Sequence, residues 1–118
     1  MSDPSTWRDA KYLADIRASG RLILEYTNTV TREELMLSVQ LQDAVIRRFQ
    51  VIGEAARRIS DATQVAHPSV RWRDIVGMRH RLVHDYVDVD LGIVWTAARV
   101  QVPALLDAFE QIVVTDDS

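Results

Sequence analysis

The sequence predicts an all-α protein, an up-and-down bundle of four to five helices. Apolar residues recur at helical spacings along four long segments, and no stretch alternates apolar and polar residues as a half-buried strand would. Helix-breaking residues are scarce, with 4 glycines and 3 prolines. Four long helices with short connections are typical of an up-and-down bundle. The 118 residues are 47% hydrophobic, so we expect one domain over residues 1–118.

The first helix is predicted to begin near Pro4, with Asp3 as its N-cap, because proline is well tolerated at the first helical position. Asn28 is a suitable terminator, and Gly20 weakens the middle of the segment. The expected buried stripe consists of Leu13, Ile16, Ile23 and either Tyr26 or Thr27.

The second helix has a clear start, because Thr31 and Glu34 have the spacing of a capping box. The apolar residues that follow predict a single amphipathic helix of more than about 25 residues. They are Leu35, Val39, Val45, Phe49, Ile52, Ala56 and Ile59. The arginine pairs at 47–48 and 57–58 lie on its polar face. We interpret them as solvated surface, with phosphate contact as the alternative.

Residues 60–70 are predicted to form a connection in which His67, just before a proline, has a structural or incidental role. The third helix is expected from Trp72 to Val83 or just beyond. The fourth is expected to begin at Asp90, a good N-cap, and to kink or restart at Pro103, which cannot continue the helical hydrogen bonding.

Composition narrows the class of protein. No apolar run approaches the length of a membrane span, and the N-terminus lacks the basic-then-apolar pattern of a signal peptide. With no cysteine, a disulfide framework and a thiolate metal site are excluded. A cytoplasmic protein without a membrane partner is the simplest interpretation.

The charge is weakly acidic overall but locally basic. A net charge of -3 argues mildly against a DNA-coating protein. Of the 14 basic residues all but Lys11 are arginine. Arginine suits forked contacts to phosphate, but a GC-rich genome that favours arginine codons would give the same bias. Residues 71–84 contain four arginines and one carboxylate, that of Asp74. A basic patch of this kind can bind RNA even on a protein that is acidic overall.

The candidate site is the run GMRHRLVHDY at residues 77–86. It places Arg79, His84 and Tyr86 in the order R-x4-H-x-Y, with His80 and Arg81 between them. Metal-free cleavage of RNA needs a base for the ribose 2′-hydroxyl, an acid for the leaving oxygen and a cation for the phosphorane. Histidine, whose side chain ordinarily titrates near neutral pH, can transfer the protons, and the forked guanidinium of arginine can supply the cation.

Other interpretations of the same residues stay open. His80 and His84 are four apart and could form half of a metal site with Asp74 or Asp85, although the surrounding arginines repel a divalent cation. His84 could also be a residue at a helix end, favoured there by the helix dipole. A serine or cysteine hydrolase and a phosphate-binding glycine loop lack their motifs.

Helical spacing alone does not bring the two proposed catalytic groups together. Arg79 and His84 are five residues apart, which is roughly 140° around a helix. We therefore expect the helix to end near His84 and a second copy of the chain to complete the site across a dimer interface.

Nearly the whole chain resembles the HepT toxins, the HEPN-superfamily half of HepT–MntA toxin–antitoxin pairs. The ordered markers are QDAVIR at 42–47, IGEAA at 52–56, WRDIVGMR at 72–79, LVHDY at 82–86, VW at 94–95 and VPALL at 102–106. The resemblance implies a HEPN-like helical bundle that forms a homodimer or a larger assembly.

The resemblance also implies a metal-independent ribonuclease toxin without a cofactor, in a type II-like pair controlled by AMPylation. It places the catalytic residues at Arg79 and His84. A cognate MntA-like nucleotidyltransferase antitoxin would attach AMP to Tyr86, where the added negative charge would repel RNA. The alternative function is a non-catalytic HEPN module that binds nucleotides or proteins.

One residue departs from the family pattern, because His80 stands where asparagine usually follows the motif arginine. His80 is then either an auxiliary proton-transfer group or a replacement for a structural amide. Arg81 is a further candidate auxiliary residue beside it.

Overall fold

The computed structural model describes the backbone of residues 4–83 and 90–116, with side chains for residues 8–77, 90–110 and 112. Its helices are α1 (Pro4–Asn28), α2 (Arg32–Leu37), α3 (Val39–Arg58), α4 (Asp61–Ala66), α5 (Trp72–Val83), α6 (Leu91–Thr96), the π-helical η1 (Ala97–Gln101) and α7 (Val102–Asp116). The described residues contain no strand, so the predicted all-α class is confirmed.

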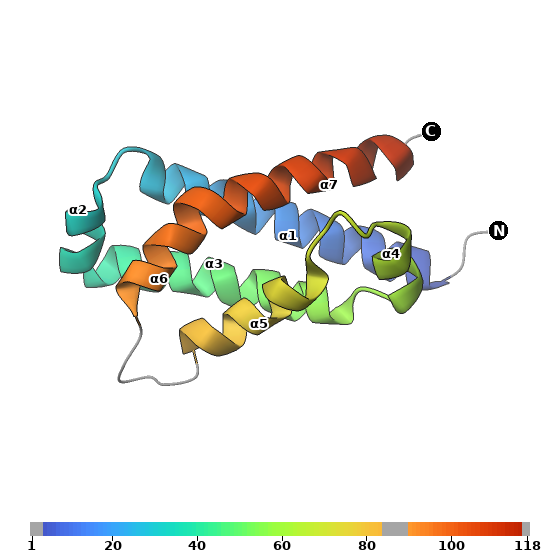
Figure 1. Ribbon diagram of the computed structural model, residues 1–118, viewed down its shortest axis with the longest axis horizontal. Coiled ribbons are helices and arrows are strands. Elements are labelled where there is room, and N and C mark those ends of the chain that lie inside the picture. The colour runs from blue at the N-terminus through green and yellow to red at the C-terminus, as the bar shows by residue number, and fades with distance from the viewer. Residues whose placement is uncertain (1–3, 84–89, 117–118) are drawn as a thin grey trace.

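Four long helical segments run up and down along the molecule (Figure 1). They are α1, α3, α5 and the bent run that joins α6, η1 and α7. α1 packs along both α3 and α7, and α5 packs along α3. The predicted up-and-down arrangement is therefore confirmed, with the short helices α2 and α4 placed in two of the connections. Among the described residues, no helix has both the length and the apolar character needed to cross a membrane.

The start of α2 has the predicted capping box. The hydroxyl of Thr31 accepts a hydrogen bond from the N–H of Glu34 at 3.1 Å, and the Glu34 carboxylate accepts one from the N–H of Thr31 at 3.1 Å. Leu35 in the first turns is fully buried, which fixes α2 against the bundle.

The prediction of one long second helix is wrong, because the chain breaks at Ser38 between α2 and α3. Ser38 has an extended backbone, and its hydroxyl caps α3 by accepting from the N–H of Leu41 at 3.1 Å. The side-chain amide of Gln42 donates to the carbonyls of Leu35 at 2.9 Å and Met36 at 3.1 Å. Two helix ends are thus satisfied by local side chains, so the break leaves few backbone groups unpaired.

The connection predicted over residues 60–70 contains a short helix, α4. Ser60 is its N-cap, and Asp9 of α1 holds this cap in place. The buried Asp9 carboxylate accepts from the Ser60 hydroxyl at 2.6 Å, the Ser60 N–H at 3.0 Å and the Thr63 hydroxyl at 2.5 Å. No residue of α4 is buried, so these hydrogen bonds provide its main described link to α1.

The last long segment begins as predicted, with the Asp90 carboxylate accepting from the N–H groups of Gly92 and Ile93 at 2.9 and 3.3 Å. The chain stays helical through Pro103. In place of the predicted kink or restart, a π-helical turn precedes the proline. The N–H of Val102 donates to the carbonyl of Ala97, five residues back, just before the proline. A proline has no N–H and crowds the carbonyl four residues before it, and the wider turn accommodates both effects.

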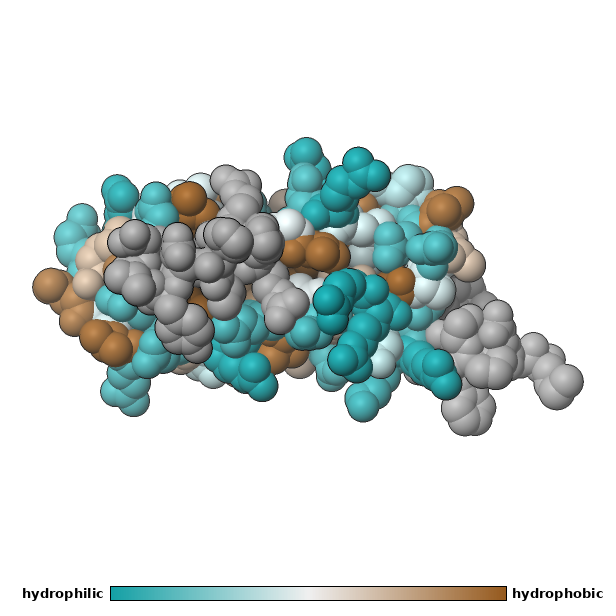
Figure 2. Space-filling model, turned by 90° about the horizontal axis from the view of Figure 1, so that it is seen from below, coloured by the Kyte–Doolittle hydropathy of each residue, from teal (hydrophilic) through white to brown (hydrophobic). Residues whose placement is uncertain are grey.

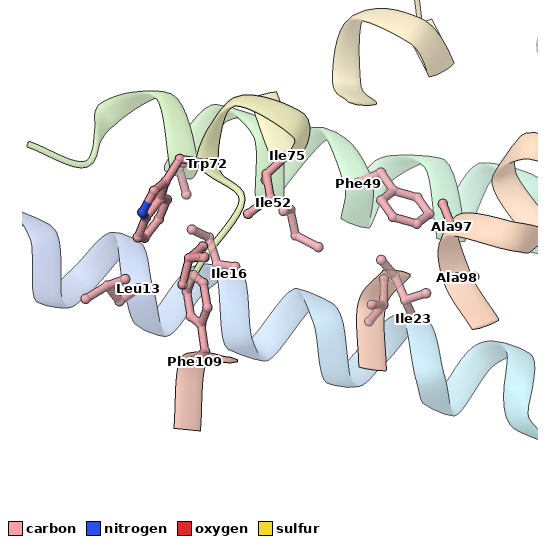
Figure 3. Packing of buried hydrophobic residues seen from close by; sticks show 14 of the residues in the cluster. Leu13, Ile16, Ile23, Phe49, Ile52, Trp72, Ile75, Ala97, Ala98 and Phe109 are labelled. Carbon is pink, nitrogen blue, oxygen red and sulfur yellow. The ribbon is translucent and has the colours of Figure 1, made fainter. Parts of the chain in front are cut away.

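The core lies where α1, α3, α5 and α7 meet, and Figure 3 shows its side chains. The predicted stripe of α1 is confirmed, since Leu13, Ile16, Ile23 and Thr27 are buried. Gly20 has a packing role, because an added Cβ there would lie 3.0 Å from the Cδ2 of Leu106. Its small size allows α7 to approach α1 closely.

Candidate nucleic-acid interface

The start of α5 is fixed by Trp72, whose side chain is buried. Its indole N–H donates to the carbonyl of His67 at 3.1 Å, and its ring lies 5.6 Å from the ring of Phe109 on α7. His67 ends α4, and its N–H donates to the carbonyls of Thr63 and Gln64. The expected structural role of His67 therefore lies in its backbone, which holds both α4 and the indole that begins α5.

The first turn of α5 is charged on its outer side, and many hydrophilic residues cover the face of the molecule on which α5 lies (Figure 2). Arg71 and Asp74 form an exposed ion pair with a nitrogen–oxygen distance of 2.7 Å, and Arg73 is exposed beside them. An exposed pair of this kind contributes little to stability and is readily exchanged for another partner. This turn therefore carries two exposed guanidinium groups and one carboxylate, which leaves a net positive charge for an incoming anion.

The predicted site residues fall partly inside and partly outside the described chain. Arg79, His80 and Arg81 lie in the last turns of α5, where the helical backbone is described but these side chains are not. His84 and Tyr86 lie outside the described residues, as does the expected helix end near His84. The convergence of Arg79 with His84 therefore stays a prediction.

The helical register places residues 79 and 80 on different sides of α5. Position 79 lies one turn after Ile75 and two turns after Trp72, both of which are buried. His80 lies two turns after Arg73, which is exposed. The backbone at Arg79 is therefore on the side of α5 that packs on the bundle, whereas the backbone at His80 follows the outer side.

Gly77 lies on this outer side, between Arg73 and His80. A Cβ at residue 77 would meet nothing within 4 Å among the described residues. A helical glycine costs roughly 0.5–1 kcal/mol relative to alanine, and neither the packing nor the backbone of the described chain requires one here. The outer side of α5 thus has room for the close approach of another molecule.

Sequence reasoning missed a hollow between α2 and α6. Arg32, Trp95 and Gln101 line it together with residues near the start of α6. In the sequence, Arg32 reads as part of a capping box and Trp95 as part of an apolar stripe. Only the packing of α2 on α6 brings the guanidinium and the indole into one hollow, so no local pattern could have indicated it.

A metal site is not formed by the described side chains. Among residues 8–77, 90–110 and 112, no group of three histidine, aspartate or glutamate side chains is placed to hold a metal ion. Asp74 of the considered metal set is paired with Arg71 in an exposed ion pair. The other members, at residues 80, 84 and 85, lie beyond these described side chains.

Comparison with known proteins identifies the family. Residues 16–112 match the family described as "Ribonuclease HepT-like". The chain is 35% identical over 101 residues to a protein of Thermococcus cleftensis named "Probable ribonuclease HepT", covering 86% of this chain and 92% of that protein. It is 34% identical over 107 residues to a Methanocaldococcus jannaschii protein, covering 90% of this chain and 92% of that protein, whose name describes a putative RNase.

A longer protein of Methanocaldococcus jannaschii is 36% identical over 106 residues, covering 89% of this chain but 48% of that protein. The name of that protein joins a gamma-glutamylcyclotransferase to a putative RNase. No solved structure shows a significant match. The family match spans most of the helical bundle and contains the whole R-x4-H-x-Y run, and the chain therefore belongs to the HepT-like ribonuclease family.

Proposed function

We propose that this protein is a metal-independent endoribonuclease in which Arg79 and His84 are the catalytic residues. The observation that carries the proposal is the family match over residues 16–112, which includes Arg79, His84 and Tyr86 in the sequence order R-x4-H-x-Y. The basic first turn of α5, with Arg71 and Arg73 exposed, supports an RNA substrate.

The proposed reaction is attack of a ribose 2′-oxygen on the adjacent phosphorus. The new bond to the 2′-oxygen forms as the bond to the 5′-oxygen breaks, which leaves a cyclic phosphate and a free 5′-hydroxyl. His84 takes the proton of the attacking hydroxyl, and protonated imidazole or water returns one to the leaving oxygen. The forked N–H groups of Arg79 stabilise the extra charge on the phosphorane oxygens.

The proposed active form is a homodimer or an assembly of dimers. Gly77 leaves room on the outer side of α5, where a partner helix can approach. An open groove of about 460 Å³ between α5 and α7, above Phe49 and Ile52, and the exposed Val100 at its edge also present apolar surface. Apolar surface of this kind is typical of protein–protein contacts.

Control of the nuclease is proposed to act on Tyr86. In a type II-like pair, an MntA-like nucleotidyltransferase would form a phosphodiester between the tyrosine oxygen and the α-phosphorus of ATP, releasing pyrophosphate. The attached adenylyl groups carry negative charge and bulk two residues from His84. They would compete with RNA for the cationic groups of the site.

The direct test is incubation of the purified protein with labelled single-stranded RNA, with and without EDTA. Cleavage that is unchanged by EDTA and yields cyclic phosphate ends supports the proposal. Binding without cleavage would instead support the alternative function, a non-catalytic module that binds nucleotides or proteins. Cleavage only after addition of a divalent cation would contradict metal independence.

A further inference from the structure

We propose that the hollow between α2 and α6 is a nucleotide subsite, in which an unpaired RNA base stacks on Trp95 while Arg32 contacts its phosphate. This inference rests on the proposed ribonuclease function and names a place where the substrate is held outside the R-x4-H-x-Y run. The observation that carries it is the meeting of a guanidinium, an indole and an amide in one hollow.

The hollow has a suitable size and lining. Its volume is about 570 Å³, within the range of roughly 300–1,000 Å³ typical of small-molecule sites. Arg32 at the start of α2 lines it together with Trp95, Thr96 and Gln101 of α6 and η1, and Trp95 is partly buried against the core. Single-stranded RNA is commonly held by an aromatic platform beside a cationic group.

Arg32 is available to an anion. Its side chain is exposed, and it takes part in no ion pair within residues 8–77, 90–110 and 112. Its terminal nitrogen lies 3.1 Å from the position of a Cβ added at Gly92, so the guanidinium lies against the backbone of α6. The absence of a side chain at residue 92 therefore leaves room for the guanidinium, which borders the hollow that Trp95 also lines.

The polar groups of the hollow suit a base edge better than a bare phosphate. The carboxylate of Asp90 also lines it, and this charge would oppose an anion that filled the hollow. One Asp90 oxygen already caps α6, which leaves the other to accept from an N–H of a base. Gln101 offers both a donor and an acceptor, and Thr96 offers a hydroxyl.

The hollow is also near the proposed catalytic residues in the chain. Asp90 follows His84 by six residues, so their Cα atoms are at most about 21 Å apart. The end of α5, the start of α6 and α2 all lie toward the same end of the molecule (Figure 1). A strand cleaved beside His84 can therefore extend into the hollow.

The test measures binding of a labelled 2′-O-methyl RNA oligonucleotide, which cannot be cleaved because its 2′-oxygen carries no proton. Fluorescence anisotropy is recorded for the whole protein and for Arg32→Gln, Trp95→Leu, Trp95→Phe and Arg21→Gln. Arg21 is an exposed arginine on α1 outside the hollow and serves as the matched control. Circular dichroism melting confirms that each variant is folded.

We expect Trp95→Leu to weaken binding at least about 5-fold, because stacking of one base on an aromatic ring raises the affinity by that factor or more. Trp95→Phe should retain most of the affinity. Arg32→Gln should weaken binding and lower the slope of log affinity against log salt by about 0.7, the value for one phosphate contact on a single strand. A purely structural role for Arg32 would leave that slope unchanged.

Two results would overturn the subsite: no binding of the oligonucleotide by the unchanged protein, or equal affinity and salt slope for Arg32→Gln, Trp95→Leu and Arg21→Gln. Because the oligonucleotide is not cleaved, these results are independent of the nuclease assay. Cleavage of ordinary RNA together with unaltered binding by the variants would leave the proposed function standing and remove the subsite alone.

Discussion

The ring of Trp72, the first residue of α5, lies 5.6 Å from the ring of Phe109 on α7, tilted by 52°. The two rings come from different helices, and Figure 3 shows both in the buried cluster that also contains Leu13 and Ile16. Tilted aromatic pairs at this distance stabilise a fold by more than the burial of their apolar area alone. This contact fixes where α5 begins, and thereby where the backbone at Arg79 lies, two turns later.

Replacing Phe109 should destabilise the protein strongly. The side chain is 1% exposed, and Phe109→Ala would remove the ring contact and leave a cavity in the core. We expect a loss of about 3–5 kcal/mol in the free energy of unfolding, measured by urea denaturation. Leu37→Ala is the control, because Leu37 is 86% exposed and should change stability by less than about 0.5 kcal/mol. A loss below about 1 kcal/mol for Phe109→Ala would contradict the described core.

Asp9 should make stability depend on pH. Burial by itself raises the pKa of its carboxyl, but hydrogen bonds from the Ser60 and Thr63 hydroxyls and the Ser60 N–H outweigh burial and hold the pKa below its ordinary value of 3.8. A carboxyl whose pKa is lower in the folded state stabilises that state at pH values above its pKa in the unfolded chain. This stabilisation is lost as the pH falls through the pKa of the folded state. Asp9→Asn should therefore cost about 1–3 kcal/mol at pH 7.

The same comparison at low pH supplies the check. As the pH falls below about 4, the difference in unfolding free energy between the unchanged protein and Asp9→Asn should shrink. Urea denaturation at pH 7 and pH 3 measures it, with Asp61→Asn as the control because Asp61 is exposed. A difference that is equal at both pH values would mean that the Asp9 charge is not what secures α4.

Gly77→Ala should separate stability from activity. Alanine favours a helix over glycine by roughly 0.5–1 kcal/mol, and the added methyl group meets no described atom within 4 Å, so the isolated fold should become more stable. If another protomer or RNA approaches α5 here, the same methyl group should lower the cleavage rate. Melting and single-turnover cleavage are measured together, with Glu110→Ala on α7 as the control. An unchanged rate would show that nothing approaches Gly77 closely.

Arg79→Ala and His84→Ala should each abolish RNA cleavage while the protein stays folded. The first removes the group proposed to stabilise the phosphorane, and the second removes the proton-transfer group. Arg73→Ala is the matched control, because Arg73 is an exposed arginine on the same helix. It should weaken RNA binding moderately and retain the chemical step. If either alanine variant at 79 or 84 cleaves at the full rate, the catalytic assignment is wrong.

Tyr86→Phe should keep nuclease activity and escape neutralisation. The phenol oxygen is the proposed acceptor of AMP, and phenylalanine lacks it. Mass spectrometry of the protein coexpressed with its neighbouring nucleotidyltransferase should show added mass on Tyr86 and none on Tyr86→Phe, while Tyr26→Phe, with its tyrosine on α1, remains modified. Neutralised complex with unmodified Tyr86 would instead indicate inhibition by occlusion.

Where helix ends are governed by neighbouring residues, they could be read directly from the sequence. Thr31 and Glu34 cap α2 as their spacing predicts, and Asp90 caps α6. The break at Ser38 was missed because its apolar neighbours continue the helical spacing. What ends α2 there is the amide of Gln42, which reaches back to the carbonyls of Leu35 and Met36.

The candidate site divides in a similar way. The helix that carries Arg79 and the proposed roles of Arg79 and His84 come from residues that lie close together in the chain, and the family comes from the order of short motifs along it. The hollow at Arg32 and Trp95 does not, because these residues are 63 positions apart by their numbers and only the contact of α2 with α6 brings them together.

The sequence by itself determined the helical class, most helix starts and the family, because helical periodicity, capping groups and ordered motifs are properties of neighbouring residues. Only the tertiary structure decided that Asp9 anchors α4, that Gly20 admits α7 and that Arg32 and Trp95 line one hollow. Those relationships depend on packing between helices distant in the chain, where shape and hydrogen bonding act across the bundle and leave no local pattern.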